Sequence, residues 1–177
     1  MYQFHTTIHA RPAEAVAGEP VNLNGQPFGT LKLAPQLLGT SLFACTFEQA
    51  SSRLTQLPRM YCEPDGSFVW TSSRDEIAWQ VDGNLYDRAD RLLFVDAKGS
   101  CPPAQLDRLL AALGWPDTKL MFQLVREAVL LDEGAFRRHA GADTPPGTHT
   151  PTAAHASLRP SPTRQSSSQA ARGKGEN

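Results

Sequence analysis

The sequence predicts an α/β domain in which a small mixed sheet is flanked by helices, followed by a disordered C-terminal tail. Three observations predict this fold class. The chain has 177 residues, a length that suits one domain. About 40% of the residues are hydrophobic and 20% are charged, which is ordinary globular composition. Between residues 46 and 125, apolar periodicities predict helix, three strands, helix and strand in that order, as in a layer of helices over a sheet.

Residues 1–45 are expected to form an N-terminal arm or a loose hairpin. Glycine and proline interrupt this segment repeatedly, at Gly18, Pro20, Gly25, Pro27, Gly29, Pro35 and Gly39. The run QPFGTLKL predicts a short strand preceded by a turn.

The first helix is predicted over residues 46–57. Phe47, Ala50 and Leu54 fall on one face of a helix, because they are spaced at i, i+3 and i+7. Thr46 is a residue type that caps helices at the N-terminus, and Pro58 ends the stretch.

Strand patterns follow in residues 60–98. Residues 60–62 and 67–71 flank the turn signal Asp65-Gly66. Apolar residues then alternate with polar ones around Trp79 and Val81, and the polar run DRAD separates this strand from another, RLLFVDAK.

A second helix is predicted over residues 102–113, and a strand after it. An apolar stripe at i, i+3, i+4 and i+7 indicates the buried face of the helix, with members Leu106, Leu109, Leu110 and Leu113. Gly114 and Pro116 end the helix. Residues 119–125 read as a short buried strand, and residues 126–139 favour a helix in their last turns.

Residues 141–177 are predicted to be disordered. They are rich in proline, serine, threonine, alanine and glycine, and Leu158 is their only large aliphatic residue, so they cannot bury enough apolar surface to offset the entropy of ordering. The domain organisation expected is therefore an arm at 1–45, a core at 46–140 and a tail at 141–177. The core carries a small excess of acidic residues, which does not favour binding nucleic acid by charge alone.

Several functional classes are disfavoured by composition. Cys45, Cys62 and Cys101 stand apart from one another, so a zinc site is not expected. No apolar run is long enough to span a membrane, and the N-terminus lacks the apolar region of a secretory signal. We expect a cytoplasmic protein with no membrane partner.

The residues that best suggest chemistry are Asp82, Asp96 and Lys98. If the hairpin turn centres near Ala89, Asp82 lies directly opposite Asp96, and Lys98 faces the same way as Asp96. Two opposed carboxylates repel unless a divalent cation lies between them, and Mg²⁺ accepts one or two carboxylates together with water and phosphate oxygens. Such a metal can activate water, and a neighbouring lysine can offset charge in the transition state.

This arrangement resembles the PD-(D/E)xK superfamily of restriction-endonuclease-like nucleases, over roughly residues 46–125. The resemblance implies that Asp82 is the first acid, that Asp96-Ala97-Lys98 is the D-x-K motif, and that Glu48 is an accessory metal ligand. It implies a nuclease that uses Mg²⁺ or Mn²⁺ to hydrolyse phosphodiester bonds of nucleic acid. A rival alignment uses Pro64-Asp65 as the first motif, but the Asp-Gly turn alone explains Asp65.

The alternative is a non-catalytic protein-interaction module on an α/β scaffold, with the tail as a tether. On this interpretation Asp96 and Lys98 are an exposed pair of opposite charges, which contributes little to stability. The two hypotheses differ in whether Asp82, Asp96 and Lys98 converge on a site or face open solvent.

Overall fold

The structure, a computed structural model that describes residues 1–142, is mostly β and contains 11 strands and three α-helices. The expected α/β fold with a small mixed sheet is therefore wrong. The strands are β1 (Tyr2–Ala10), β2 (Val16–Ala17), β3 (Val21–Leu23), β4 (Gln26–Phe28), β5 (Leu31–Lys32), β6 (Met60–Cys62), β7 (Ser67–Thr71), β8 (Gln80–Arg88), β9 (Arg91–Cys101), β10 (Leu120–Leu124) and β11 (Val129–Asp132). The helices are a short 3-10 helix η1 (Pro35–Leu37) and the α-helices α1 (Phe47–Thr55), α2 (Pro103–Ala112) and α3 (Glu133–Ala142).

Nine of the strands form one sheet, in the order β2-β5-β11-β10-β1-β9-β8-β7-β6, and every pair in it is antiparallel. Strands β3 and β4 form a separate hairpin. The N-terminal strand β1 lies between β9 and β10, near the middle of the sheet. Residues 2–10, which the sequence analysis placed in an N-terminal arm or hairpin, thus form a strand near the middle of the sheet.

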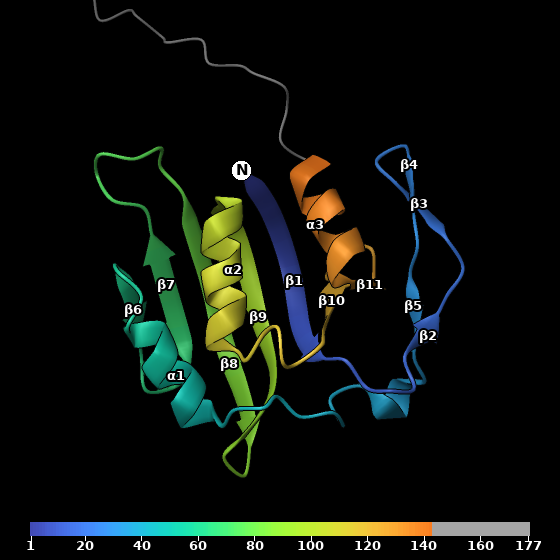
Figure 1. The fold of residues 1–177 in the computed structure, drawn as a ribbon, viewed down its shortest axis with the longest axis horizontal. Helices are drawn as coiled ribbons and strands as arrows, with labels where there is room; N and C mark the ends of the chain where they lie inside the picture. The colour runs from blue at the N-terminus through green and yellow to red at the C-terminus, as the bar shows by residue number, and fades with distance from the viewer. Residues whose placement is uncertain (143–177) are drawn as a thin grey trace, which may run out of the picture. The chain divides into compact units, whose positions relative to one another are not determined.

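The three α-helices lie on the same face of the sheet (Figure 1). Alternate residues of β1, such as Phe4 and Ile8, are buried on that face, whereas His5 on the other face is exposed. The ring of Phe136 from α3 stacks on Phe122 of β10, with ring centroids 4.0 Å apart. One core therefore fills the space between the helices and one side of the sheet, and the opposite side carries no α-helix in the described part of the chain.

Helices α1 and α2 confirm two sequence predictions. Thr46 caps α1 through its side chain, which accepts a hydrogen bond from the Gln49 backbone N–H, and Gln49 returns one to the Thr46 N–H. This reciprocal arrangement satisfies two amide donors that a helix start otherwise leaves unpaired. All four leucines of the predicted α2 stripe are at most 1% exposed: Leu106, Leu109, Leu110 and Leu113.

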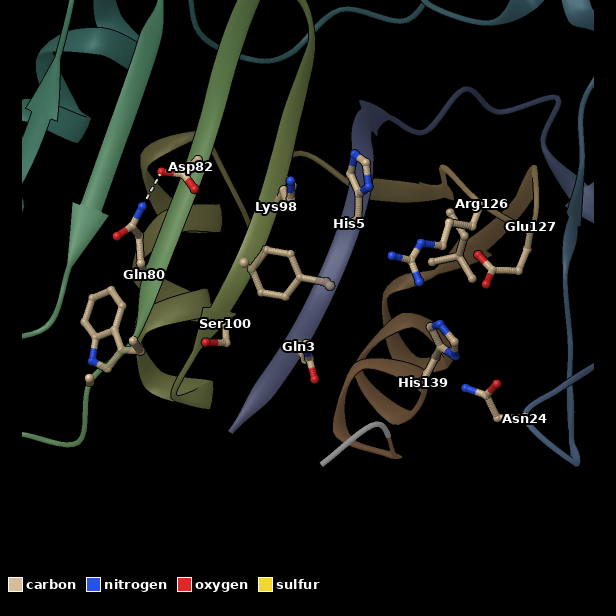
Figure 2. A pocket seen from close by; sticks show the side chains of 15 residues that line it. Gln3, His5, Asn24, Gln80, Asp82, Lys98, Ser100, Arg126, Glu127 and His139 are labelled. Carbon is tan, nitrogen blue, oxygen red and sulfur yellow. Dashed lines mark hydrogen bonds between the residues drawn. The ribbon is translucent and has the colours of Figure 1, made fainter. Parts of the chain in front are cut away.

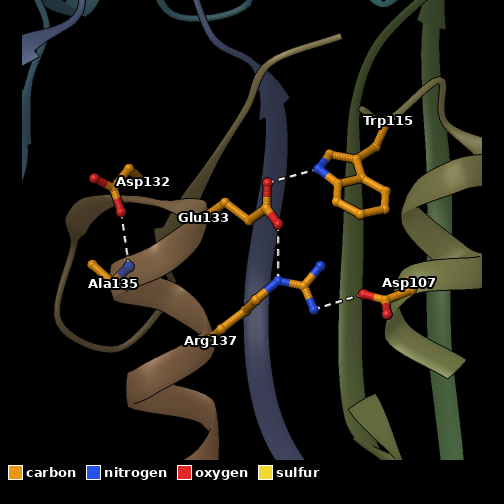
Figure 3. Close-up of polar contacts among 6 residues, drawn as sticks. All are labelled: Asp107, Trp115, Asp132, Glu133, Ala135 and Arg137. Carbon is orange, nitrogen blue, oxygen red and sulfur yellow. Dashed lines mark hydrogen bonds and ion pairs between the residues drawn. The ribbon is translucent and has the colours of Figure 1, made fainter. Parts of the chain in front are cut away.

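A polar cluster centred on Arg137 ties α3 to α2 and to the turn that follows α2 (Figure 3). The Arg137 guanidinium contacts Asp107 of α2 at 2.7 Å and Glu133, one turn earlier in α3, at 2.9 Å. The second oxygen of Glu133 accepts a hydrogen bond from the Trp115 indole N–H at 2.7 Å. These contacts fix the position of α3 over the sheet.

The reason that the fold was mispredicted lies at the two ends of the described chain. Strand β1 carries His5, Thr7 and His9 on one face, so it lacks the apolar composition typical of a central strand. Strand β11 follows a turn containing Arg126 and Glu127, in a segment for which no strand was predicted, whereas the helix expected in the last turns of residues 126–139 is present as α3. Most connections are also hairpins, so the strands run antiparallel.

The predicted disordered tail lies outside the described residues from 143 onward, and residues 141–142 complete α3. Within residues 1–142, no helix is long and apolar enough to cross a membrane.

Candidate functional site

The helix-free face of the sheet carries all three residues of the predicted site. Asp82 is on β8, and Asp96 and Lys98 are on β9. Because side chains alternate between faces along a strand, residues of the same parity in these paired strands share a side. The prediction that the three share one face therefore agrees with the observed register.

The predicted register within this hairpin is wrong. Asp82 lies opposite Lys98, and the residue opposite Asp96 is Asn84. The turn consists of Ala89 and Asp90, both with positive φ, as a two-residue hairpin turn of type I′ requires. This turn is centred between residues 89 and 90 and not at Ala89, which shifts the pairing by one residue from the predicted register. An irregularity between Tyr86 and Asp87 shifts the pairing by one more residue. The two shifts together move the register by two residues, which preserves the face and changes the partner.

The carboxylates of Asp82 and Asp96 each accept a hydrogen bond from another side chain. The Thr7 hydroxyl on β1 donates to Asp96 Oδ1 at 2.6 Å, and the Gln80 amide donates to Asp82 Oδ1 at 2.7 Å. The two aspartates occupy diagonal positions in the register, for which Cα atoms are typically about 7–8 Å apart. They are therefore less close than the directly opposed pair that the sequence predicted.

Glu48 does not join these carboxylates. It lies exposed in the first turn of α1, and α1 packs on the helix-covered face of the sheet (Figure 1). In the described part of the chain, no group of three or more histidine, cysteine, aspartate or glutamate side chains is placed to hold a metal ion. Asp82 and Asp96 thus offer two carboxylates for Mg²⁺ or Mn²⁺ without a third acidic, histidine or cysteine side chain beside them among the described residues.

The Asp65 carboxylate of the rival motif is engaged by its own turn. Its Oδ1 accepts hydrogen bonds from the Ser67 backbone N–H at 2.9 Å and from the Ser67 hydroxyl at 2.8 Å. These bonds stabilise the ionised form and lower the pKa of Asp65 below its ordinary range. The turn interpretation therefore accounts for this residue.

Next to Asp82 and Lys98, the sheet is hollowed into an open pocket of about 850 Å³, here named the sheet pocket (Figure 2). Its floor is formed by polar residues of three neighbouring strands: Gln80, Asp82, Lys98, Ser100, Gln3 and His5. Ala78 and Trp79 border one end. Arg126, Glu127, His139 and Asn24 border the other.

Basic side chains without partners occupy the middle of the sheet pocket. Lys98 lies directly opposite His5 in the register, and the Val125 amide, next to Arg126, donates to the His5 carbonyl oxygen. Figure 2 shows the Arg126 guanidinium directed toward β1. Among residues 1–142, none of these three side chains makes an ion pair or a hydrogen bond, although Asp82 is the register partner of Lys98.

A second polar group on this face, around His9, lies further along β1 and is only partly satisfied, because His9 Nδ1 is buried without a hydrogen-bond partner among the described residues. His9 is 3% exposed; its Nε2 lies 3.4 Å from Gln123 Oε1, and its ring lies against Phe94. Burial lowers the pKa of His9 below the ordinary value, while the contact with Gln123 and the charge of Asp96 act in the opposite direction. Burial therefore favours the neutral form of this histidine, which packs within the sheet.

Exposed apolar side chains flank the polar residues of the helix-free face. Tyr61 on the edge strand β6 is 64% exposed, and its register partner Val69 on β7 is 38% exposed. Val69 in turn lies beside Asp82. Tyr86, stacked on Phe94 with ring centroids 4.5 Å apart, is also 38% exposed.

Sequence reasoning identified Asp82 and Lys98 but not the other members of the sheet pocket. His5 and Arg126 come from β1 and from the turn after β10, and no local pattern links either of them to β9. The alternation of polar residues in β1, QFHTTIH, is the signal that could have identified a strand with one polar face.

No protein-family model, curated protein or solved structure matched this chain.

Proposed function

We propose that this chain is a protein-interaction module that binds a partner protein through the helix-free face of its sheet. One observation carries the proposal. All three α-helices cover one face of the nine-stranded sheet, while the other face combines exposed apolar side chains with the sheet pocket.

The residues on this face are more typical of a binding surface than of a sheet face that is exposed only to water. An antiparallel sheet with one solvated face normally alternates between apolar residues on the core side and polar residues on the outer side. Here Tyr61, Val69 and Tyr86 interrupt the polar outer side. Aromatic residues surrounded by polar ones are typical of protein interfaces, where tyrosine often contributes much of the binding energy.

Size-exclusion chromatography of the tagged full chain in an extract of its source cells tests this proposal. The wild type should elute within a complex larger than the chain alone. Tyr61→Asp and Val69→Asp should each elute as the free chain, because a carboxylate buried against the partner lacks compensation. Ser52→Asp, an exposed position on α1, is the control and should elute like the wild type.

Equal elution of Val69→Asp, Tyr61→Asp and the wild type would contradict the proposal. Melting temperatures of the purified variants separate lost binding from lost folding, and two variants on different strands make a shared folding defect easy to recognise.

A second candidate is the metal-dependent nuclease that the D-x-K resemblance suggests. It is favoured by one observation, that Asp82, Asp96 and Lys98 share an open face. The free oxygens of Asp82 and Asp96 would be the ligands for Mg²⁺ or Mn²⁺, and the metal would supply an activated water. The diagonal spacing of the carboxylates and the position of Glu48 support this candidate less well than the interaction module.

Incubation of the full chain with Mg²⁺ or Mn²⁺ and single-stranded or double-stranded DNA and RNA tests the nuclease. Cleavage that disappears in Asp96→Asn would favour it over the interaction module. Absence of cleavage with every substrate and both metals would remove it.

A further inference from the structure

The sheet pocket contains a row of basic groups that lack acidic partners. Lys98, His5 and Arg126 come from three different parts of the chain and lie side by side across β9, β1 and the turn after β10. All three are exposed, and within residues 1–142 none of them forms an ion pair. An anionic group placed here would gain contacts with several positive charges without breaking existing ones.

Acidic residues stand at both ends of this row. Asp82 on β8 precedes Lys98, and Glu127 follows Arg126. The charges across the sheet pocket therefore run negative, positive, positive, negative through Asp82, Lys98, Arg126 and Glu127, with the His5 ring between the two cations. A ligand that complements them has a short acidic centre and no long run of negative charge beyond it.

The dimensions of the row match a short extended peptide. Neighbouring strands lie about 4.8 Å apart, so β8 to β1 spans roughly 10 Å. An extended chain advances about 3.3 Å per residue, so about five residues reach from Asp82 past His5 to Arg126. The pocket volume of about 850 Å³ lies within the range of 300–1,000 Å³ that is typical of ligand sites.

We infer that the sheet pocket binds a short acidic segment of a partner protein, whose carboxylates contact Lys98, His5 and Arg126. This inference rests on the proposed function and names the chemistry of the partner. The exposed Val69, beside Asp82, provides an apolar contact for a residue that flanks the acidic centre.

Charge complementarity favours a peptide over nucleic acid. A nucleic-acid strand carries a negative charge at every phosphate, so it would meet Asp82 or Glu127 as well as the three bases. Proteins that bind nucleic acid without base readout use many lysine and arginine contacts along the backbone. This pocket offers two such side chains.

Titration of the full-length chain with a hexaglutamate peptide blocked at both ends tests the inference. Trp79 lines the pocket, so tryptophan fluorescence reports occupancy, and calorimetry provides a readout that does not depend on Trp79. The wild type should bind saturably, and the affinity should fall as salt rises from low to high concentration, since exposed charges are screened.

Charge-reversal variants locate the binding. Lys98→Glu and Arg126→Glu should each weaken hexaglutamate binding by about tenfold or more, because like charges placed against each other oppose association. Lys119→Glu is the matched control. It removes the same charge from an exposed residue next to the opposite end of β10, and it should bind like the wild type.

Three results would overturn the inference: no saturable binding of hexaglutamate, binding that Lys98→Glu and Arg126→Glu leave unchanged, or tighter binding of an octathymidylate by a Lys98-dependent mode. The last result would identify nucleic acid as the ligand. Failure of the proposed function is distinguishable from these, because it appears as unchanged elution of Tyr61→Asp and Val69→Asp in the extract, whatever hexaglutamate does.

Discussion

The leucine stripe of α2 provides the most demanding test of the described packing. Leu110 is 0% exposed and lies in the core between α2 and the sheet, with Leu106 and Leu113 on the same helix face. Replacing a fully buried leucine with alanine costs about 2–5 kcal/mol, and the higher values occur where the surroundings cannot collapse into the cavity. Because Leu110 is fully enclosed by the core, the cost of Leu110→Ala should fall within that range.

Denaturant unfolding of Leu110→Ala and the wild type measures this loss, and thermal melting should show a decrease of about 10 °C or more. The control is Leu38→Ala, the same change at a residue that is 38% exposed. It should cost about 1 kcal/mol or less. If Leu110→Ala cost no more than Leu38→Ala, α2 would not pack on the sheet as described.

Three further predictions concern the sheet. Gly83→Ala should destabilise the fold by about 1–3 kcal/mol in denaturant unfolding, because a Cβ there would come within 2.2 Å of the Phe68 ring and 2.4 Å of the Asp96 carbonyl oxygen; an unchanged midpoint would contradict this close packing. Because burial lowers the pKa of His9, the unfolded chain takes up a proton on this residue near pH 6.5, before the folded chain does. The free energy of unfolding is therefore higher above that pH and decreases as the pH falls below it. His9→Asn should flatten this part of the stability profile between pH 7 and 5, and a profile identical to that of the wild type would show that His9 does not cause it. If the nuclease candidate holds, millimolar Mn²⁺ should raise the melting temperature of the wild type but not of Asp82→Asn, whereas no rise in either protein argues for the interaction module.

Local sequence patterns predicted the individual elements best where each element carries its own signal. The Thr46 cap, the Pro58 stop and the spacing of Ala50 and Leu54 together define α1, and the structure confirms them. The same is true of β6 and β7, since the Asp65-Gly66 turn between them is encoded by adjacent residues.

Local sequence patterns could not predict the order of the strands in the sheet. Strand β1 pairs with β9 and β10, which are about 90 and 115 residues away in sequence, as in Thr7↔Asp96 and Thr7↔Gln123. No local periodicity encodes such a partner. The polar face of β1 also concealed a strand at the middle of the sheet, so the order of the strands and the fold class were mispredicted.

The candidate site shows the same division between local and long-range information. Alternation along β8 and β9 was sufficient to place Asp82, Asp96 and Lys98 on one face. Alternation could not predict the register of the two strands, because the register depends on two positive-φ residues in the turn and on the irregularity at Tyr86. His5 and Arg126 joined the site only through the folding of distant segments.

Site-specific photo-cross-linking tests the central claim, that the helix-free face contacts a partner protein. A photoreactive phenylalanine analogue is incorporated at Tyr61 or Val69 on this face, or at Ser52 or Arg108 on the helices, all of them exposed. After irradiation in source-cell extract, positions 61 and 69 should give the same discrete adduct, and positions 52 and 108 should not. Adducts of equal yield from both faces, or from the helices alone, would contradict the account.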